Sequence, residues 1–164
     1  MEDKTRRILQ CRVLLAETTP LNSDCGTLCG AACCRSLEGE ETGMLLFPGE
    51  AALYADKPDF RLLETGRGTL LICPGVCDRA DRPLACRLFP LLPLVRETGI
   101  RVAVDARARA VCPLRRTDAC AERFVAAVRQ AGEILADDPE QRCFLMELTR
   151  EHDDLRAMQK RMGV

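Results

Sequence analysis

The chain carries eleven cysteines in 164 residues, and seven of them fall into two groups with short spacings. A first group lies within ten residues, a second follows after a gap, and one cysteine completes the set: Cys25, Cys29, Cys33 and Cys34, then Cys73, Cys77 and Cys86, then Cys112. This density is typical of a site that holds a metal ion or an iron–sulfur core from several sides, because a tetrahedral centre needs four converging ligands. The spacing therefore predicts that these eight cysteines are metal ligands.

The local sequence limits how these thiols are shared. Neighbouring side chains usually diverge, so Cys33 and Cys34 both ligate only if they reach different metals or the backbone turns sharply; otherwise one ligates and one packs. A Pro-Gly turn between Cys73 and Cys77 can bring both to one ion. The eight thiols suit two four-thiolate sites, one cluster with spare thiols, or a multinuclear centre with bridging sulfur.

Two arginines flank Cys86 in the sequence. Arg82 and Arg87 could donate hydrogen bonds to metal-bound thiolates, or they could pair with nearby Asp78 and Asp81 as surface ion pairs. The residues alone do not separate these alternatives.

The three remaining cysteines and the single histidine are not expected to bind metal. Cys11, Cys120 and Cys143 lie in expected helices with apolar neighbours, where a cysteine usually behaves as a small hydrophobe. His152, the only histidine, lies in a charged helical segment and is expected to be exposed to solvent rather than to bind metal.

Charge and hydrophobic patterning narrow the class of protein. The formal net charge is −1, and one Tyr, five Phe and no Trp offer few stacking platforms, so nucleic-acid binding is not expected. No apolar stretch approaches the ~20 residues that a membrane span needs. Residues 1–7 are charged, and residues 13–16 are too short an apolar run for a secretory leader. We therefore expect a cytoplasmic protein with no membrane partner, in which reduced thiols favour metal ligation over disulfides.

The expected fold is a single α+β domain over residues 1–164, with a cysteine cluster region at 24–113 and helices at 118–160. Apolar periodicity, turn residues and capping residues give the elements. They are a helix at 5–17, a ligand-wrapping loop with short helical turns at 20–41, strands at 43–47 and 69–72, a short helix beginning at 51, a β-hairpin of 91–95 with 100–104, and an antiparallel helix pair in which Asp118 caps the first helix and Asp138-Pro139 begins the second. The hairpin would return Cys112 to the neighbourhood of Cys86.

The cysteine motifs carry a family resemblance. Asp24-Cys25-Gly26, Cys29-Gly30 and Cys33-Cys34 are similar to the first signature of the YkgJ-type cysteine cluster family, described as zinc- or iron-chelating domains. Cys73, Cys77 and the Arg82-Pro83-Leu84-Ala85-Cys86-Arg87-Leu88-Phe89-Pro90 segment resemble its second signature. The resemblance, which spans residues 24–112, implies metal or iron–sulfur binding through the matching cysteines.

The leading functional hypothesis is a metal-binding protein whose thiolates hold zinc and order the loops. The same thiolates could instead hold a [4Fe–4S] core in a redox protein or enzyme. The cysteine-cluster domain also resembles part of flagellin lysine-N-methylases, which implies an iron–sulfur enzyme as one relative. A third hypothesis is a metal-delivery module. Substrate, reaction and oligomeric state are not indicated by the sequence.

Overall fold

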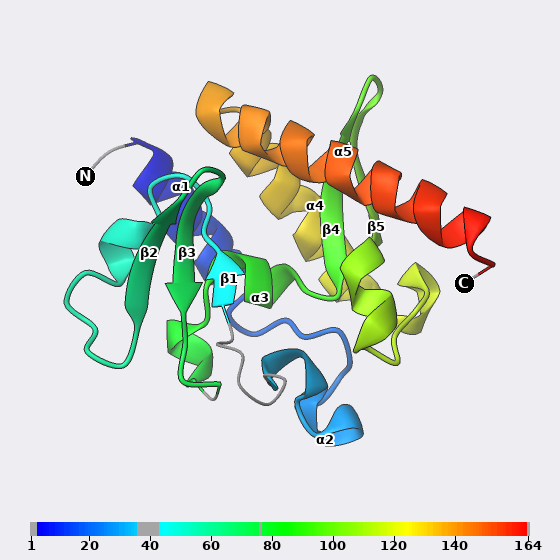
Figure 1. The fold of residues 1–164 in the computed structure, drawn as a ribbon, viewed down its shortest axis with the longest axis horizontal. Helices are drawn as coiled ribbons and strands as arrows, with labels where there is room; N and C mark the ends of the chain where they lie inside the picture. Colours follow the sequence, from blue (N-terminus) through cyan, green and yellow to red (C-terminus); the bar gives the residue numbers. More distant parts are fainter. Residues whose placement is uncertain (1–2, 36–42, 76, 164) are drawn as a thin grey trace.

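The computed structural model describes residues 3–35, 43–75 and 77–163. Helices and two small antiparallel sheets alternate along these parts of the chain, so the predicted α+β class is confirmed (Figure 1). The α-helices and strands are α1 (Asp3–Leu14), α2 (Gly26–Cys29), β1 (Gly43–Leu45), β2 (Arg61–Thr65), β3 (Gly68–Ile72), α3 (Leu84–Leu88), β4 (Leu91–Arg96), β5 (Gly99–Val104), α4 (Glu122–Ala136) and α5 (Pro139–Arg161).

The main hydrophobic core lies around the β4–β5 hairpin, which forms as predicted with Leu91 opposite Val104 and Arg96 opposite Gly99. Helices α4 and α5 pack on this hairpin more extensively than on each other, and α1 packs against α4. The predicted apolar face of α4 is buried: Phe124, Val128, Ala131 and Leu135. We call this cluster, with the buried residues of α1 and α5, the main core.

Of the two C-terminal helices, α5 begins where the sequence predicts and α4 does not. The second helix begins at Pro139, where the sequence restarts the helical pattern, and the Asp138 carboxylate caps it by accepting hydrogen bonds from the Glu140 and Gln141 backbone N–H groups at 3.0 and 2.9 Å. The cap predicted at Asp118 is wrong: this residue lies in a short 3₁₀ turn, pairs with Arg116, and precedes the start of α4.

A second sheet has the strand order β1-β3-β2, and both pairings are antiparallel. Strands β1 and β3 were predicted, whereas β2 was not. The reason is its exposure: in β2 only Leu62 is even half-buried, so the strand shows no run of buried apolar residues. Its pairing is set by the tight turn between Thr65 and Gly68 instead.

Residues 21–35 form a cysteine-rich segment with little regular structure. The expected short helical turns are present as the single turn of α2 and a 3₁₀ turn at Ala32–Cys34. No residue between 21 and 35 is buried. The end of the predicted loop, residues 36–41, lies outside the described residues. In Figure 1 this segment lies below α3, and its Leu21 packs half-buried against the main core.

Candidate metal centre

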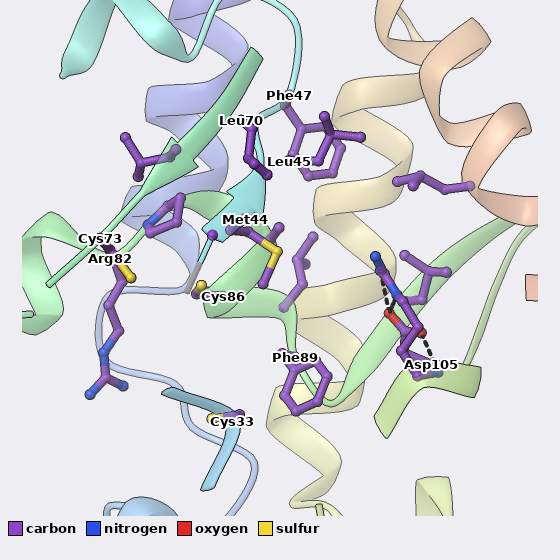
Figure 2. Close-up of a pocket in the computed structure, with 18 of the residues that line it drawn as sticks. Cys33, Met44, Leu45, Phe47, Leu70, Cys73, Arg82, Cys86, Phe89 and Asp105 are labelled. Atoms are coloured by element: carbon purple, nitrogen blue, oxygen red, sulfur yellow. Dashed lines mark hydrogen bonds and ion pairs between the residues drawn. The ribbon is translucent and has the colours of Figure 1, made fainter. Parts of the chain in front are cut away.

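All eight predicted cysteines line two adjoining cavities. The larger, of about 690 Å³, is bordered by Cys33, Cys34, Cys73, Cys77 and Cys86. The smaller, of about 60 Å³, is bordered by Cys25, Cys29, Cys33, Cys86 and Cys112. Cys33 and Cys86 border both. Four stretches of chain that are distant in sequence therefore bring their thiols to one region, and the labelled Cys33, Cys73 and Cys86 show this in Figure 2.

The first cysteine group is positioned by a helical turn followed by a sharp reversal. The turn of α2 places Cys25 and Cys29 on one side, with the Cys29 Sγ 3.9 Å from the Cys25 carbonyl oxygen. Gly30 and Ala31 then both adopt positive φ, +60° and +55°, which reverses the chain. The 3₁₀ turn that follows leaves the sulfur atoms of Cys33 and Cys34 4.0 Å apart. The backbone thus turns sharply at the adjacent pair, which was one of the two conditions for both to ligate.

The second group meets the first at Gly75. This residue has φ = +82°, and a Cβ atom placed on it would lie 3.5 Å from the Cys34 carbonyl oxygen. The Pro-Gly turn between Cys73 and Cys77 therefore lies against the backbone of the first group. Val76, inside that turn, lies outside the described residues.

Cys86 is held by α3, a short helix that was not predicted because its five residues show no full helical period. Glu50, which is completely buried, fixes this helix: its carboxylate accepts hydrogen bonds from the Leu84 N–H at 2.7 Å and the Phe47 N–H at 3.3 Å. Burial raises the pKa of Glu50 above its usual value, while these two bonds act in the opposite direction. The helix that carries Cys86 is consequently tied to the chain that leaves β1.

Arg87 has a structural role that differs from both alternatives offered by the sequence. Its guanidinium donates to backbone carbonyl oxygens of Arg82, Arg79, Ala80 and Arg12, at 2.9, 2.8, 2.9 and 3.4 Å. It therefore holds the 79–82 turn against α1 rather than pairing with Asp78 or Asp81. The carboxylate of Asp81 pairs with Lys57 instead.

Arg82 is the cation that faces the thiols. It borders both cavities, and its Nε is buried without a hydrogen-bond partner among the described residues. Its charge lowers the pKa of Cys25, Cys34 and Cys77, in opposition to the effect of burial. A buried donor without a partner is costly, so a thiolate acceptor at this place would remove a penalty.

The thiols fall into two electrostatic neighbourhoods. Burial is the main cause that raises the pKa of Cys25 and Cys112, and the nearby Cys29 adds to it in both cases. Burial likewise raises the pKa of Cys77 and Cys86, with added contributions from two neighbours that they share, Cys34 and Cys73.

Cys33 lies between these neighbourhoods. Its hydrogen bond with Cys34 and its burial raise its pKa, and both Cys25 and Cys86 add to the effect. In the reverse direction, the hydrogen bond from Cys33 and the charge of Arg82 lower the pKa of Cys34.

The donor set matches soft-metal chemistry, although the thiols are not drawn together around a point. Within the described residues, no three His, Cys, Asp or Glu side chains lie close enough together to hold a metal ion as they are placed. The donors that border the two cavities are mainly thiols, with one carboxylate, Asp105, in the larger cavity. Clustered thiols with an adjacent arginine suit Zn²⁺ or an iron–sulfur core and not Mg²⁺ or Ca²⁺, which require oxygen ligands.

Two of the three cysteines assigned to the core are indeed buried. Burial raises the pKa of Cys11 to about 12 and that of Cys120 to about 11. The prediction for Cys143 is wrong, because its side chain is exposed on the outer face of α5.

The expected exposure of His152 is also wrong. This residue is buried, and its Nδ1 accepts a hydrogen bond from the Ala106 N–H at 3.2 Å. It continues the buried row of Leu145, Leu148 and Thr149 at helical spacing, a signal that the surrounding charges concealed.

No helix in the described parts of the chain is long and apolar enough to cross a membrane. Comparison of the chain with protein-family models, with curated proteins and with solved structures finds no match.

Proposed function

We propose that this protein binds metal through thiolates of its eight clustered cysteines, with zinc as the occupant. The observation that carries the proposal is the gathering of these cysteines, from four separated stretches of chain, around two adjoining cavities that share Cys33, Cys86 and Arg82. Core cysteines that only fill space do not need a common location or a shared cation.

Two four-thiolate sites agree best with the two electrostatic neighbourhoods. The first site would take Cys25, Cys29 and Cys112, and the second would take Cys34, Cys73, Cys77 and Cys86. Cys33 borders the smaller cavity and completes the first set. In this arrangement, the adjacent Cys33 and Cys34, whose sulfur atoms lie 4.0 Å apart, serve different ions.

The burial pattern supports a structural role for the metal. Residues 21–35 contribute no fully buried residue, and Leu21 at their start packs half-buried against the main core, so the hydrophobic effect does little to fix the cysteines that follow. Structural zinc supplies an apparent binding free energy on the order of 10–16 kcal/mol at neutral pH, which is enough to order such a segment. Arg82 would donate to the ligated sulfur atoms and would stabilise their negative charge.

Anaerobic purification followed by elemental analysis and visible spectroscopy tests the occupant. We expect a colourless protein that contains about two zinc ions per chain, as two closed four-thiolate sites require. Bound iron and sulfide, together with broad visible absorption, would instead show that the occupant is an iron–sulfur cluster rather than zinc. A native protein free of every transition metal after growth with supplements would overturn the proposal as a whole.

Single substitutions test the ligand set. Cys86→Ala and Cys34→Ala should each lower the metal content by one ion, whereas Cys120→Ala should keep the full content. Cys120 is a matched control because it is buried close enough to Cys112 and Cys25 for their charges to affect its pKa, yet it borders neither cavity. Equal metal content in all three variants would contradict the assignment.

The exposure of Cys33 favours a second function, metal delivery. Its side chain is exposed, and the exposed Leu28 and Val111 border the same cavities. A ligand at the surface gives an acceptor thiol access to the ion. Transfer of zinc to a small-molecule chelator within seconds would support delivery, whereas exchange over many hours would support a closed structural site.

A further inference from the structure

The adjacent thiols of Cys33 and Cys34 are held close together by local contacts. Their sulfur atoms lie 4.0 Å apart, and a disulfide bond needs about 2.05 Å, so a shift of about 2 Å would join them. Hydrogen bonds close the backbone that presents them. The Cys34 N–H donates to the Ala31 carbonyl oxygen at 2.8 Å, and the Nε of Arg35 donates to the carbonyl oxygen of Gly30 at 3.0 Å. The proximity of the two thiols therefore does not require metal.

The pair is also open to small solutes. Cys33 is exposed and Cys34 is half-buried, whereas Cys11 and Cys120 in the main core are buried. Cys33 borders both cavities, and Cys34 borders the larger one. Exposure makes a cysteine susceptible to oxidation, and a second thiol within reach lets the first oxidation product end as a disulfide. A small oxidant therefore meets this pair more readily than it meets the core cysteines.

From this arrangement we infer that Cys33 and Cys34 are a site of reversible oxidation, at which a hydroperoxide converts the two thiols to a disulfide and thereby opens both proposed metal sites at once. Adjacent Cα atoms lie about 3.8 Å apart, closer than the separation of about 4.4–6.8 Å that disulfides usually have, so the bond is readily reduced again. The effect on metal rests on the proposed function, in which the two cysteines serve different ions. Formation of the disulfide does not depend on that function.

The reaction balances with hydrogen peroxide as the oxidant. The thiolate of one cysteine attacks a peroxide oxygen: an S–O bond forms, the O–O bond breaks, and the leaving hydroxide takes a proton to become water. The thiolate of the other cysteine then attacks the sulfenic sulfur: an S–S bond forms, the S–O bond breaks, and a second water leaves. The two thiols lose two electrons and two protons in total, and one peroxide is reduced to two waters.

The disulfide removes one ligand from each ion. The thiolate is the form of cysteine that binds metal, and a sulfur atom in a disulfide no longer carries this charge. Each of the two proposed sites would keep three thiolates: Cys25, Cys29 and Cys112 in the first, and Cys73, Cys77 and Cys86 in the second. Three thiolates should bind zinc at least about tenfold more weakly than four. One oxidised pair would therefore release two ions.

Treatment of the metal-free full chain with hydrogen peroxide tests the disulfide. Free thiols are then blocked with N-ethylmaleimide, and trypsin leaves residues 13–35 as one peptide, because residues 13–34 contain no Lys or Arg. We expect mass spectrometry to find this peptide labelled at two of its four cysteines, with Cys33 and Cys34 unlabelled, and fully labelled after reduction with dithiothreitol. Labels on Cys33 and Cys34 after peroxide treatment, or a disulfide from either one to another cysteine, would overturn the oxidation site.

Serine variants identify the two partners. Cys33→Ser and Cys34→Ser should each abolish the disulfide within the peptide, whereas Cys143→Ser should leave it unchanged. Cys143 is the matched control because its side chain is exposed like that of Cys33, yet it borders neither cavity. The variants are compared without metal, so a change in metal affinity does not disturb the result. A disulfide that persists in either Cys33→Ser or Cys34→Ser would contradict the pairing.

The zinc-loaded protein tests the link to metal. We expect peroxide to release two zinc ions for each Cys33–Cys34 disulfide formed, and we expect reduction in the presence of zinc to restore both. Retention of one or both ions by protein that carries the disulfide would overturn the simultaneous opening of the two sites. A chain that forms the disulfide but never binds zinc would overturn the proposed function while supporting the oxidation site.

Discussion

The main core and the cysteine-rich segment of residues 21–35 are held in place by different forces. In the main core, Phe124, Val128 and Leu135 are fully buried against the β4–β5 hairpin and α1. Residues 21–35 contain two short helical turns and no buried side chain. The first region is therefore stabilised by removal of apolar surface from water, whereas the second depends on backbone turns and on whatever its thiols bind.

The largest expected effect is the response of the two regions to metal removal. Chelation should greatly accelerate hydrogen exchange at residues 25–34 and 73–77, because zinc ligation supplies on the order of 10 kcal/mol there. Amides in the middle of α4 should keep their protection. Hydrogen exchange followed by mass spectrometry measures both, and equal acceleration in the two regions would remove the distinction between them.

A substitution that creates a cavity in the main core should lower the stability of the protein and leave its metal content unchanged. Phe124→Ala removes a fully buried ring and should cost about 3–5 kcal/mol of unfolding free energy while the metal content of the folded protein is preserved. Urea denaturation measures the first quantity and elemental analysis the second. Cys86→Ala is the reciprocal variant, expected to lose metal; a Phe124→Ala protein that is folded but metal-free would show that the regions are coupled.

Two glycines provide a matched comparison of smaller size. A Cβ on Gly132 of α4 would lie 2.6 Å from the Pro93 Cβ of β4, so Gly132→Ala should separate helix and hairpin and cost about 1–3 kcal/mol. Gly75→Ala should act instead on the cysteine turn, because φ there is +82°. We expect reduced metal affinity for Gly75→Ala and reduced global stability for Gly132→Ala, measured by chelator competition and by urea denaturation.

Metal affinity should also depend on pH. Burial holds the pKa of Cys25, Cys77, Cys86 and Cys112 above the ordinary value of 9.0, so the metal-free protein keeps these thiols protonated at neutral pH. Metal must displace these protons, so metal affinity should fall by about tenfold, or about 1.4 kcal/mol, for each displaced proton when the pH decreases by one unit. Chelator competition between pH 6 and 8 measures the slope, and a pH-independent affinity would contradict ligation by these thiols.

The same raised pKa values have a consequence for the metal-free protein. Their contribution to stability is present below the ordinary thiol pKa and is lost as the pH rises through the raised values. Urea denaturation of metal-free protein should therefore show declining stability above about pH 9, whereas the metal-loaded protein should not show this decline.

The sequence predicted the elements that have strong local signals and missed those that are set by contacts. Asp138 before Pro139 marked the start of α5, and the turn at residues 97–99 marked the hairpin. Strand β2 is exposed and pairs only through β3, so its residues show little of the alternation that identifies strands. The burial of His152 depends on the 3₁₀ turn that contains Ala106, which no local pattern reveals.

In the candidate site, too, the sequence indicates some features and others depend on contacts in the fold. Cysteine spacing indicated which side chains gather, and the structure brings all eight to two adjoining cavities. The separate roles of the two arginines could not be read from their positions on either side of Cys86 in the sequence. The Arg87 guanidinium donates hydrogen bonds to four backbone carbonyl oxygens, whereas Arg82 borders the thiols. This difference arises because residues 79–82 fold against α1.

The buried Glu50 fixes the position of the helix that carries Cys86. Because one carboxylate accepts from both Phe47 and Leu84, the short helix that carries Cys86 cannot shift without breaking a bond to the core. The stretches that carry Cys25, Cys33 and Cys34 have no such anchor. If the cysteines hold ions as proposed, Cys86 would therefore be the ligand whose position changes least when an ion binds or leaves.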